Sequence, residues 1–252
     1  MLALLAGLLG LLGLLVGSFL NVVIHRVPRR ESIVSPGSRC PGCGTPVAPR
    51  DNVPVLSWLL LRGRCRHCGV RVSARYPLVE LLTGVVFAAV VLARGPGLHL
   101  LLDLPFAAML IAVGGIDLEH RIVPNRIVVP AAVYGLVGLL LVRFDDTLEF
   151  ALAGLGAFAF LLLAALAYPA GMGMGDVKLA GVMGLFLGLA VVPAMFAAFV
   201  AGSVLGLALM VRYGARARKM GVPFGPFLAA GGVIALLVGP ELVALYADTF
   251  LT

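Results

Sequence analysis

The chain has 252 residues, of which 61% are apolar and only 12% are charged. A water-soluble domain of this composition would lack the polar surface it needs, so a soluble globular protein is excluded. The formal charge of +7 does not indicate nucleic-acid binding, because the basic residues are spread over short loops without interleaved stacking aromatics. The composition therefore predicts an all-α polytopic membrane protein with the lipid bilayer as its solvent.

About eight apolar segments could form membrane helices. The first, residues 2–24, carries no charge and is long enough for a hydrocarbon core of ~30 Å, which needs ~20 helical residues. A cleaved signal peptide is the alternative, but here the arginines follow the apolar stretch instead of preceding it. The boundary near Pro193 is the weakest, because 177–211 could also be one long kinked helix. The other predicted spans are 77–93, 98–116, 127–142, 150–168, 177–190, 192–211 and 226–247.

The distribution of Lys and Arg predicts the topology. Ten of the nineteen lie between His25 and Tyr76, and under the positive-inside rule such a segment stays in the cytoplasm. The N-terminus is then outside, and with eight spans the C-terminus is outside as well. Of the nineteen basic residues, only Arg94 and Arg143 are predicted on the outer side. Seven spans would place the basic cluster at 212–219 outside, which favours the break near Pro193. The other basic residues predicted inside are Arg121, Arg126, Lys178, Arg212, Arg216, Arg218 and Lys219.

Four cysteines lie in the polar loop 25–76. Cys40 and Cys43 form one C-x2-C pair, and Cys65 and Cys68 form a second after 21 residues. This spacing resembles a zinc ribbon, in which four thiolates close a tetrahedral site with Zn–S bonds of ~2.3 Å. Two disulfides are the alternative, but a cytoplasmic loop is normally kept reduced. Four protein ligands would saturate Zn²⁺, so the predicted metal site is structural.

Two aspartates lie at the ends of apolar segments, whereas most of the other acidic residues are expected in loops. Asp117 ends the segment 98–116, and Asp176 begins the segment 177–190. A carboxylate at membrane depth is costly, so its retention indicates function or pairing. The predicted topology brings both to the cytoplasmic side, where two carboxylates in contact would share one proton. One could then take a proton from water as it attacks a peptide carbonyl, while the other donates one.

The residues around Asp176 include Gly171, Gly173 and Gly175, which suit an irregular backbone or close approach of an extended substrate. Lys178 could neutralise negative charge nearby, or extend to the membrane interface. Simpler interpretations also exist for the aspartates. Asp176 could merely cap the following helix, and Asp117 could pair with Arg121 one turn later.

Several of these segments together resemble the prepilin peptidases, or type IV leader peptidases, of bacteria. The resemblance covers nearly the whole chain, including the paired C-x2-C loop of the long bifunctional members and a Gly-x-Gly-Asp motif at 173–176. It implies an aspartic endopeptidase with Asp117 and Asp176 as the catalytic pair. The matching segments are 17–26, 75–77, 79–84, 117–125, 173–179 and 223–227.

The resemblance also implies the substrates and a second activity. The substrates would be precursors of type IV pilins, or pseudopilins of type II secretion, cut at the cytoplasmic face of the inner membrane. The new N-terminus would then be methylated from S-adenosylmethionine. The expected division is a first membrane helix at 1–24, a four-cysteine loop at 25–76 assigned to methyl transfer, and a seven-helix peptidase domain at 77–252.

Two other functions are compatible with the residues alone. A proton- or ion-coupled transporter could use the two aspartates as a relay, but it predicts an inverted repeat that the sequence does not contain. An assembly scaffold could use the zinc loop to bind partners, with the aspartates serving only as caps or ion pairs.

Overall fold

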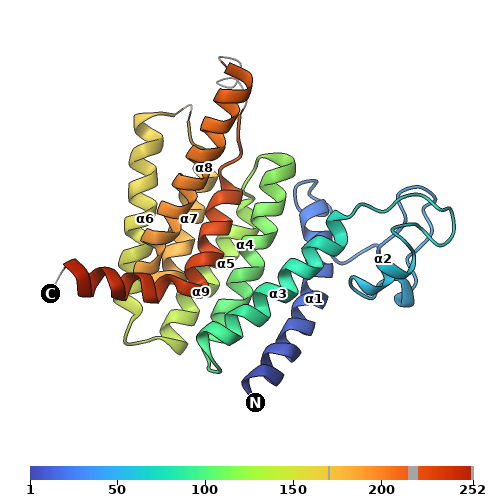
Figure 1. Cartoon of the computed structure of the whole chain (residues 1–252), viewed down its shortest axis with the longest axis horizontal. Helices are drawn as coiled ribbons and strands as arrows, with labels where there is room; N and C mark the ends of the chain where they lie inside the picture. Colours follow the sequence, from blue (N-terminus) through green and yellow to red (C-terminus); the bar gives the residue numbers. More distant parts are fainter. Residues whose placement is uncertain (170, 215–220, 251–252) are drawn as a thin grey trace. The chain divides into compact units, whose positions relative to one another are not determined.

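The computed structural model describes residues 1–169, 171–214 and 221–250, and these are mainly helical (Figure 1). No β-strand occurs in these ranges, where β-pairing is limited to the isolated bridges Arg39–Pro46 and Arg64–Arg71. The all-α prediction is therefore confirmed. The chain forms two compact units, residues 1–96 and 97–252, and each is described by itself.

The first unit is a pair of long helices joined by a loop. Helix α1 (Leu2–Arg26) packs against α3 (Arg75–Arg94), and the loop between them contains the 3₁₀ turn η1 (Pro49–Asp51) and the short helix α2 (Leu56–Leu60). Glycines let the two long helices approach closely. A Cβ atom added at Gly13 would lie 2.8 Å from the Cα of Gly84 on α3. Such small-residue contacts are typical of helix pairs in membranes.

In the part of the chain that the structure describes, the second unit contains six α-helices. The most buried is α4, in which 83% of the residues of the most apolar stretch are buried in the protein. In α5 and α6 most residues of the corresponding stretch are not buried. Helix α7 contacts all five of the other helices in the unit, so it lies at the centre of their packing. Their bounds are α4 (Leu100–His120), α5 (Asn125–Val142), α6 (Thr147–Ala167), α7 (Met174–Leu187), α8 (Val191–Tyr213) and α9 (Gly225–Phe250).

The break between α7 and α8 decides the number of spans. Seven described stretches are long and apolar enough to cross a membrane if Met174–Tyr213 is counted as one of 40 residues. A continuous helix of that length would measure ~60 Å, twice the ~30 Å hydrocarbon core. The 3₁₀ turn η2 (Gly188–Ala190) interrupts it, with Gly188 at φ +58°. The described residues thus contain eight apolar helices, but α7 has only 14 residues, ~21 Å at 1.5 Å per residue, so eight separate membrane spans stay a prediction.

The break between the two helices was predicted near Pro193, but in the structure it lies a few residues earlier, at η2. Proline was expected to cause it, but Pro193 lies in the first turn of α8, where a helix lacks partners for its N–H groups and tolerates proline. The left-handed backbone of Gly188 produces the turn instead.

The up-and-down helices bring both aspartates to one end of the second unit. The ends of α4 and α8 and the beginnings of α5, α7 and α9 lie there (Figure 1). Arg121, Lys178 and Arg212 share this end, while Arg143 lies at the other, as the charge pattern predicts. The predicted positions of Arg216, Arg218, Lys219 and the last two residues fall outside the described ranges.

A buried ion pair at the opposite end corrects one expectation. Only two acidic residues were expected away from water, but Asp103 in the first turn of α4 is fully buried. Its Oδ1 lies 3.0 Å from Nη2 of Arg143, which also donates through Nη1 to the carbonyl of Phe186 and lies over the Phe150 ring. Arg143 therefore connects α4 to residues of α6 and α7. The partners are 40 positions apart, so sequence spacing could not reveal them.

Replacing Arg143 by Gln should destabilise the protein. The variant leaves the Asp103 carboxylate buried without its guanidinium, which typically costs about 3–5 kcal/mol. We expect a correspondingly lower free energy of unfolding in detergent. Adding Asp103→Asn should restore much of the loss, because both charges are then gone. An Arg143→Gln variant as stable as the parent would contradict a structural role for the pair.

Candidate active site and four-cysteine centre

Asp117 lies in the last turn of α4, and its side chain is buried. The helix ends at Arg121, whose left-handed backbone (φ +56°) lets its N–H donate to the carbonyl of Asp117 over 2.9 Å. The Arg121 guanidinium also interacts electrostatically with the Asp117 carboxylate. The predicted ion pair between these two side chains is not formed, and the Asp117 carboxylate has another partner.

That partner is the first residue of α9. The N–H of Gly225 donates to Oδ2 of Asp117 over 3.0 Å, in a buried hydrogen bond between residues 108 positions apart. The first N–H groups of a helix have no partner within the helix, and the N-terminus carries partial positive charge. A Cβ atom at position 225 would lie 2.8 Å from the same oxygen. Only glycine lets the helix N-terminus approach the carboxylate this closely.

Asp176 lies in the first turn of α7 and is also buried. Gly173, not Asp176, is the N-cap residue, and its backbone hydrogen-bonds to the Asp176 carboxylate. Asp117 and Asp176 are close enough for their charges to interact. The two residues, 59 positions apart, therefore lie near each other at one end of the second unit.

The neighbouring connections pack around this pair. A Cβ atom at Gly175 would lie 2.7 Å from Cβ of Val123, so α7 begins directly against the turn between α4 and α5. Lys178 donates through Nζ to Oδ1 of Asn125, at the start of α5, over 3.1 Å. Gly175 and Lys178 thus join α7 to the segment that follows Asp117.

The surroundings of Gly173, unlike those of Gly175, leave room for a side chain. Its backbone is extended (φ −81°, ψ 146°), and an added Cβ atom would lie an ordinary 3.6 Å from the Asp176 carboxylate. Neither the conformation nor the described surroundings require glycine at this position. Its predicted importance therefore depends on a contact that the described residues do not make.

The four cysteines form a single cluster in the first unit. The sulfur atoms of Cys40, Cys43, Cys65 and Cys68 all lie within 4.8 Å of one another, and those of Cys40 and Cys68 are 3.6 Å apart. In a tetrahedral zinc site with Zn–S bonds of ~2.3 Å the sulfurs would be ~3.8 Å apart. All four are free cysteines, so the structure does not contain the alternative disulfides.

Each C-x2-C pair lies in the same kind of turn. In 40–45 the N–H of Gly44 donates to the carbonyl of Cys40, and in 65–70 the N–H of Gly69 donates to that of Cys65. Both glycines have φ near +70° (+69° and +71°), as the turns require. The two turns present their thiols to a common centre, and this donor set fits Zn²⁺.

The chemistry of one thiol also suits a metal. The hydrogen bond between Sγ of Cys43 and the hydroxyl of Thr45, 3.2 Å long, is the largest of several effects that lower the pKa of Cys43 to about 6. A thiolate, and not a thiol, is the form that binds metal ions.

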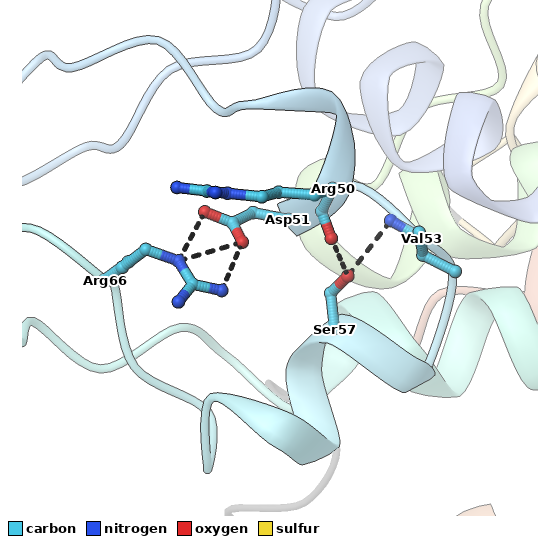
Figure 2. Close-up of polar contacts among 5 residues, drawn as sticks. All are labelled: Arg50, Asp51, Val53, Ser57 and Arg66. Atoms are coloured by element: carbon cyan, nitrogen blue, oxygen red, sulfur yellow. Dashed lines mark hydrogen bonds and ion pairs between the residues drawn. The ribbon is translucent and has the colours of Figure 1, made fainter.

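Contacts within the loop hold the turn that contains Cys65 and Cys68 in place. Figure 2 shows Arg66, which lies between Cys65 and Cys68, making a forked ion pair with Asp51 of η1 at 2.7 Å. This guanidinium lowers the pKa of Asp51. The same view shows the Ser57 hydroxyl donating to the carbonyl of Arg50 and accepting the N–H of Val53.

Two protein-family profiles match the chain. The bacterial peptidase A24 N-terminal domain profile matches residues 11–94, and the type IV leader peptidase family profile matches residues 104–211. Together they span most of both compact units. No solved structure matches the chain significantly.

Several curated proteins are similar to this chain over most of its length. A prepilin leader peptidase/N-methyltransferase of Aeromonas hydrophila is 37% identical, with 96% of this chain and 93% of that protein aligned. A protein of the same name from Bacillus subtilis (strain 168) is 34% identical, with 95% and 96% aligned. One from Myxococcus xanthus is 42% identical over 81% of this chain and 62% of that protein. Nothing in these matches supports the transporter alternative. The chain belongs to the type IV leader peptidase family, as its sequence predicts.

Proposed function

We propose that this protein is a prepilin peptidase in which Asp117 and Asp176 cleave the leader of type IV prepilins or related pseudopilins. The observation that carries the proposal is the meeting of two buried carboxylates from separate helix ends. Family membership supports a peptidase, and the buried pair provides the groups that peptide hydrolysis needs.

In the proposed reaction the two carboxylates share one proton. One takes a proton from the attacking water, while the other donates a proton to the carbonyl oxygen or to the leaving amine. Gly225 fixes Oδ2 of Asp117, and the backbone of Gly173 fixes the Asp176 carboxylate. These hydrogen bonds hold both groups before a substrate arrives, which avoids a cost of orientation during the reaction.

The proposed substrate has its own apolar helix and a short basic leader. Its scissile bond would lie at the inner surface of the cytoplasmic membrane, where the charge pattern predicts both aspartates. We propose that the extended backbone at Gly173 accepts the substrate strand, because an added Cβ atom here would have only ordinary contacts within the described chain, with Asp176 at 3.6 Å and Gly175 at 3.9 Å.

We also propose that the protein methylates the new N-terminus with S-adenosylmethionine. The support is the printed name of the similar proteins, which includes N-methyltransferase. The loop 25–76 is our candidate for this activity, and the peptidase is assigned to 77–252. We propose Zn²⁺ as a structural ion of the loop, held by Cys40, Cys43, Cys65 and Cys68.

Neutralising either aspartate should abolish cleavage. Asp117→Asn and Asp176→Asn each remove a group that can exchange a proton, so we expect cleavage of a purified prepilin to fall by at least about 100-fold. The products can be measured by mass spectrometry of the new N-terminus. Asp145→Asn is the matched control, because this exposed aspartate lies between α5 and α6, at the opposite end of the second unit. Normal cleavage by either site variant would exclude that residue as an acid or base.

Gly225→Ala should impair catalysis with little loss of folding. The added methyl group would lie 2.8 Å from Oδ2 of Asp117 and should displace the carboxylate or the start of α9. A displacement near 1 Å can cost about 100-fold in rate, so kcat should fall by roughly 10- to 100-fold. Gly206→Ala on α8 is the control, since nothing lies within 4 Å of the added atom. Equal activity of both variants would argue against the proposed role of Gly225.

Metal analysis tests the four-cysteine site. The purified protein should carry about one Zn²⁺ per chain, because a closed site of four thiolates binds a single ion. Cys40→Ser should lose this ion and make the loop more sensitive to proteolysis. His67→Ala should retain it, since the cluster consists of the four sulfurs. Zinc retained by Cys40→Ser, or lost from His67→Ala, would contradict this ligand set.

A further inference from the structure

Helix α2 of the four-cysteine loop presents an apolar face with no partner in its own unit. Leu56, Leu59 and Leu60 are 53%, 59% and 73% exposed. Positions i, i+3 and i+4 lie on one face of a helix, so the three leucines form a continuous strip. The other side of α2 packs into the loop, where Ser57 is buried and the Trp58 Nε1–H donates to the carbonyl of Val72.

A hydrogen bond fixes the height of α2 along a membrane helix. The N–H of Val55, immediately before α2, donates to Oε2 of Glu80 over 2.7 Å. Glu80 is the sixth residue of α3, about 8 Å along the axis from the first at 1.5 Å per residue. Its neighbours Leu78 and Leu81 are exposed, as expected for side chains that face lipid. The helix α2 therefore begins level with the apolar part of α3.

Basic residues accompany the apolar strip. Arg62 and Arg64, both exposed, follow α2 directly. Arg75 opens α3 and lies over the ring of Tyr76, a pair typical of the interface between lipid and water. Apolar side chains beside arginines are complementary to an anionic bilayer surface, which offers acyl chains below a layer of phosphates.

We propose that α2 is an interfacial anchor that holds the four-cysteine loop on the membrane. The three leucines enter the boundary between headgroups and acyl chains, and Arg62 and Arg64 bind the phosphates of anionic phospholipids. Glu80 positions the anchor by accepting the Val55 N–H. This role is independent of peptide cleavage and of the metal.

The single tryptophan of the chain makes the proposal measurable, because Trp58 lies within α2. The complete protein is placed in lipid nanodiscs that contain phosphatidylglycerol and a phospholipid with a nitroxide near the headgroup or deep in the acyl chain. Trp58 fluorescence should be quenched strongly by the shallow label and weakly by the deep one. The variant Leu59→Gln/Leu60→Gln should reduce the shallow quenching at least about twofold, since the two most exposed apolar side chains of the strip are then polar.

Matched controls separate anchoring from unfolding. Val34→Gln changes an exposed apolar residue of the same loop outside α2 and should leave the quenching unchanged. Each variant should retain zinc to the same extent as the parent. Arg62→Gln/Arg64→Gln should reduce quenching in phosphatidylglycerol but not in phosphatidylcholine.

Two results would overturn the proposal. If Trp58 is not quenched by the shallow label in any lipid, protein and not lipid covers the leucine strip. If Leu59→Gln/Leu60→Gln and Val34→Gln behave alike while both remain folded, the leucines do not anchor the loop.

Discussion

The structure depends on the cost of placing a carboxylate where water is scarce. Such a group must find a cation or a hydrogen-bond donor, because an isolated charge in an apolar environment is strongly unfavourable. Asp103 is paired with Arg143, Glu80 accepts the N–H of Val55, and Asp117 accepts the N–H of Gly225. Each carboxylate thereby joins segments that are distant in sequence. Because each buried carboxylate needs a partner, these residues also stabilise the packing of the helices and loops that they join.

The partners of these carboxylates differ in how much hydrogen-bonding capacity they leave to the carboxylate oxygens. Asp103 is held by a guanidinium, with both side chains largely enclosed, so the pair is suited to a structural role. Asp117 and Asp176 are instead held by backbone N–H groups at the beginnings of helices. Backbone donors orient a carboxylate while taking only part of its capacity to accept hydrogen bonds. Substrate and water can use the rest, which is what a catalytic pair requires.

Much of this arrangement could be predicted from sequence. The apolar segments predict the apolar helices, and the alternation of basic loops predicts that Asp117 and Asp176 lie at the same end. The paired C-x2-C spacing similarly predicted the sulfur cluster. These signals are local or depend only on counting spans.

The long-range partners could not be predicted in this way. Gly225 lies 108 positions from Asp117, and its N–H, like that of Val55 bonded to Glu80, leaves no mark in the residue types. Asp103 was overlooked because an acidic residue near a predicted helix end is usually explained by water. Arg143 offered a signal, since it was one of only two basic residues predicted on the outer side. The position of the α7–α8 break depended on Gly188 and not on the more conspicuous Pro193.

The central claim is that Asp117 and Asp176 act together on one scissile peptide bond. The most direct test is an experimental structure of the complete protein with a prepilin segment whose scissile peptide bond is replaced by a hydroxyethylene group. The account predicts that the hydroxyl lies within hydrogen-bond reach, about 2.6–3.2 Å, of both carboxylates. A hydroxyl that contacts only one aspartate, or a segment that binds away from both, would contradict it.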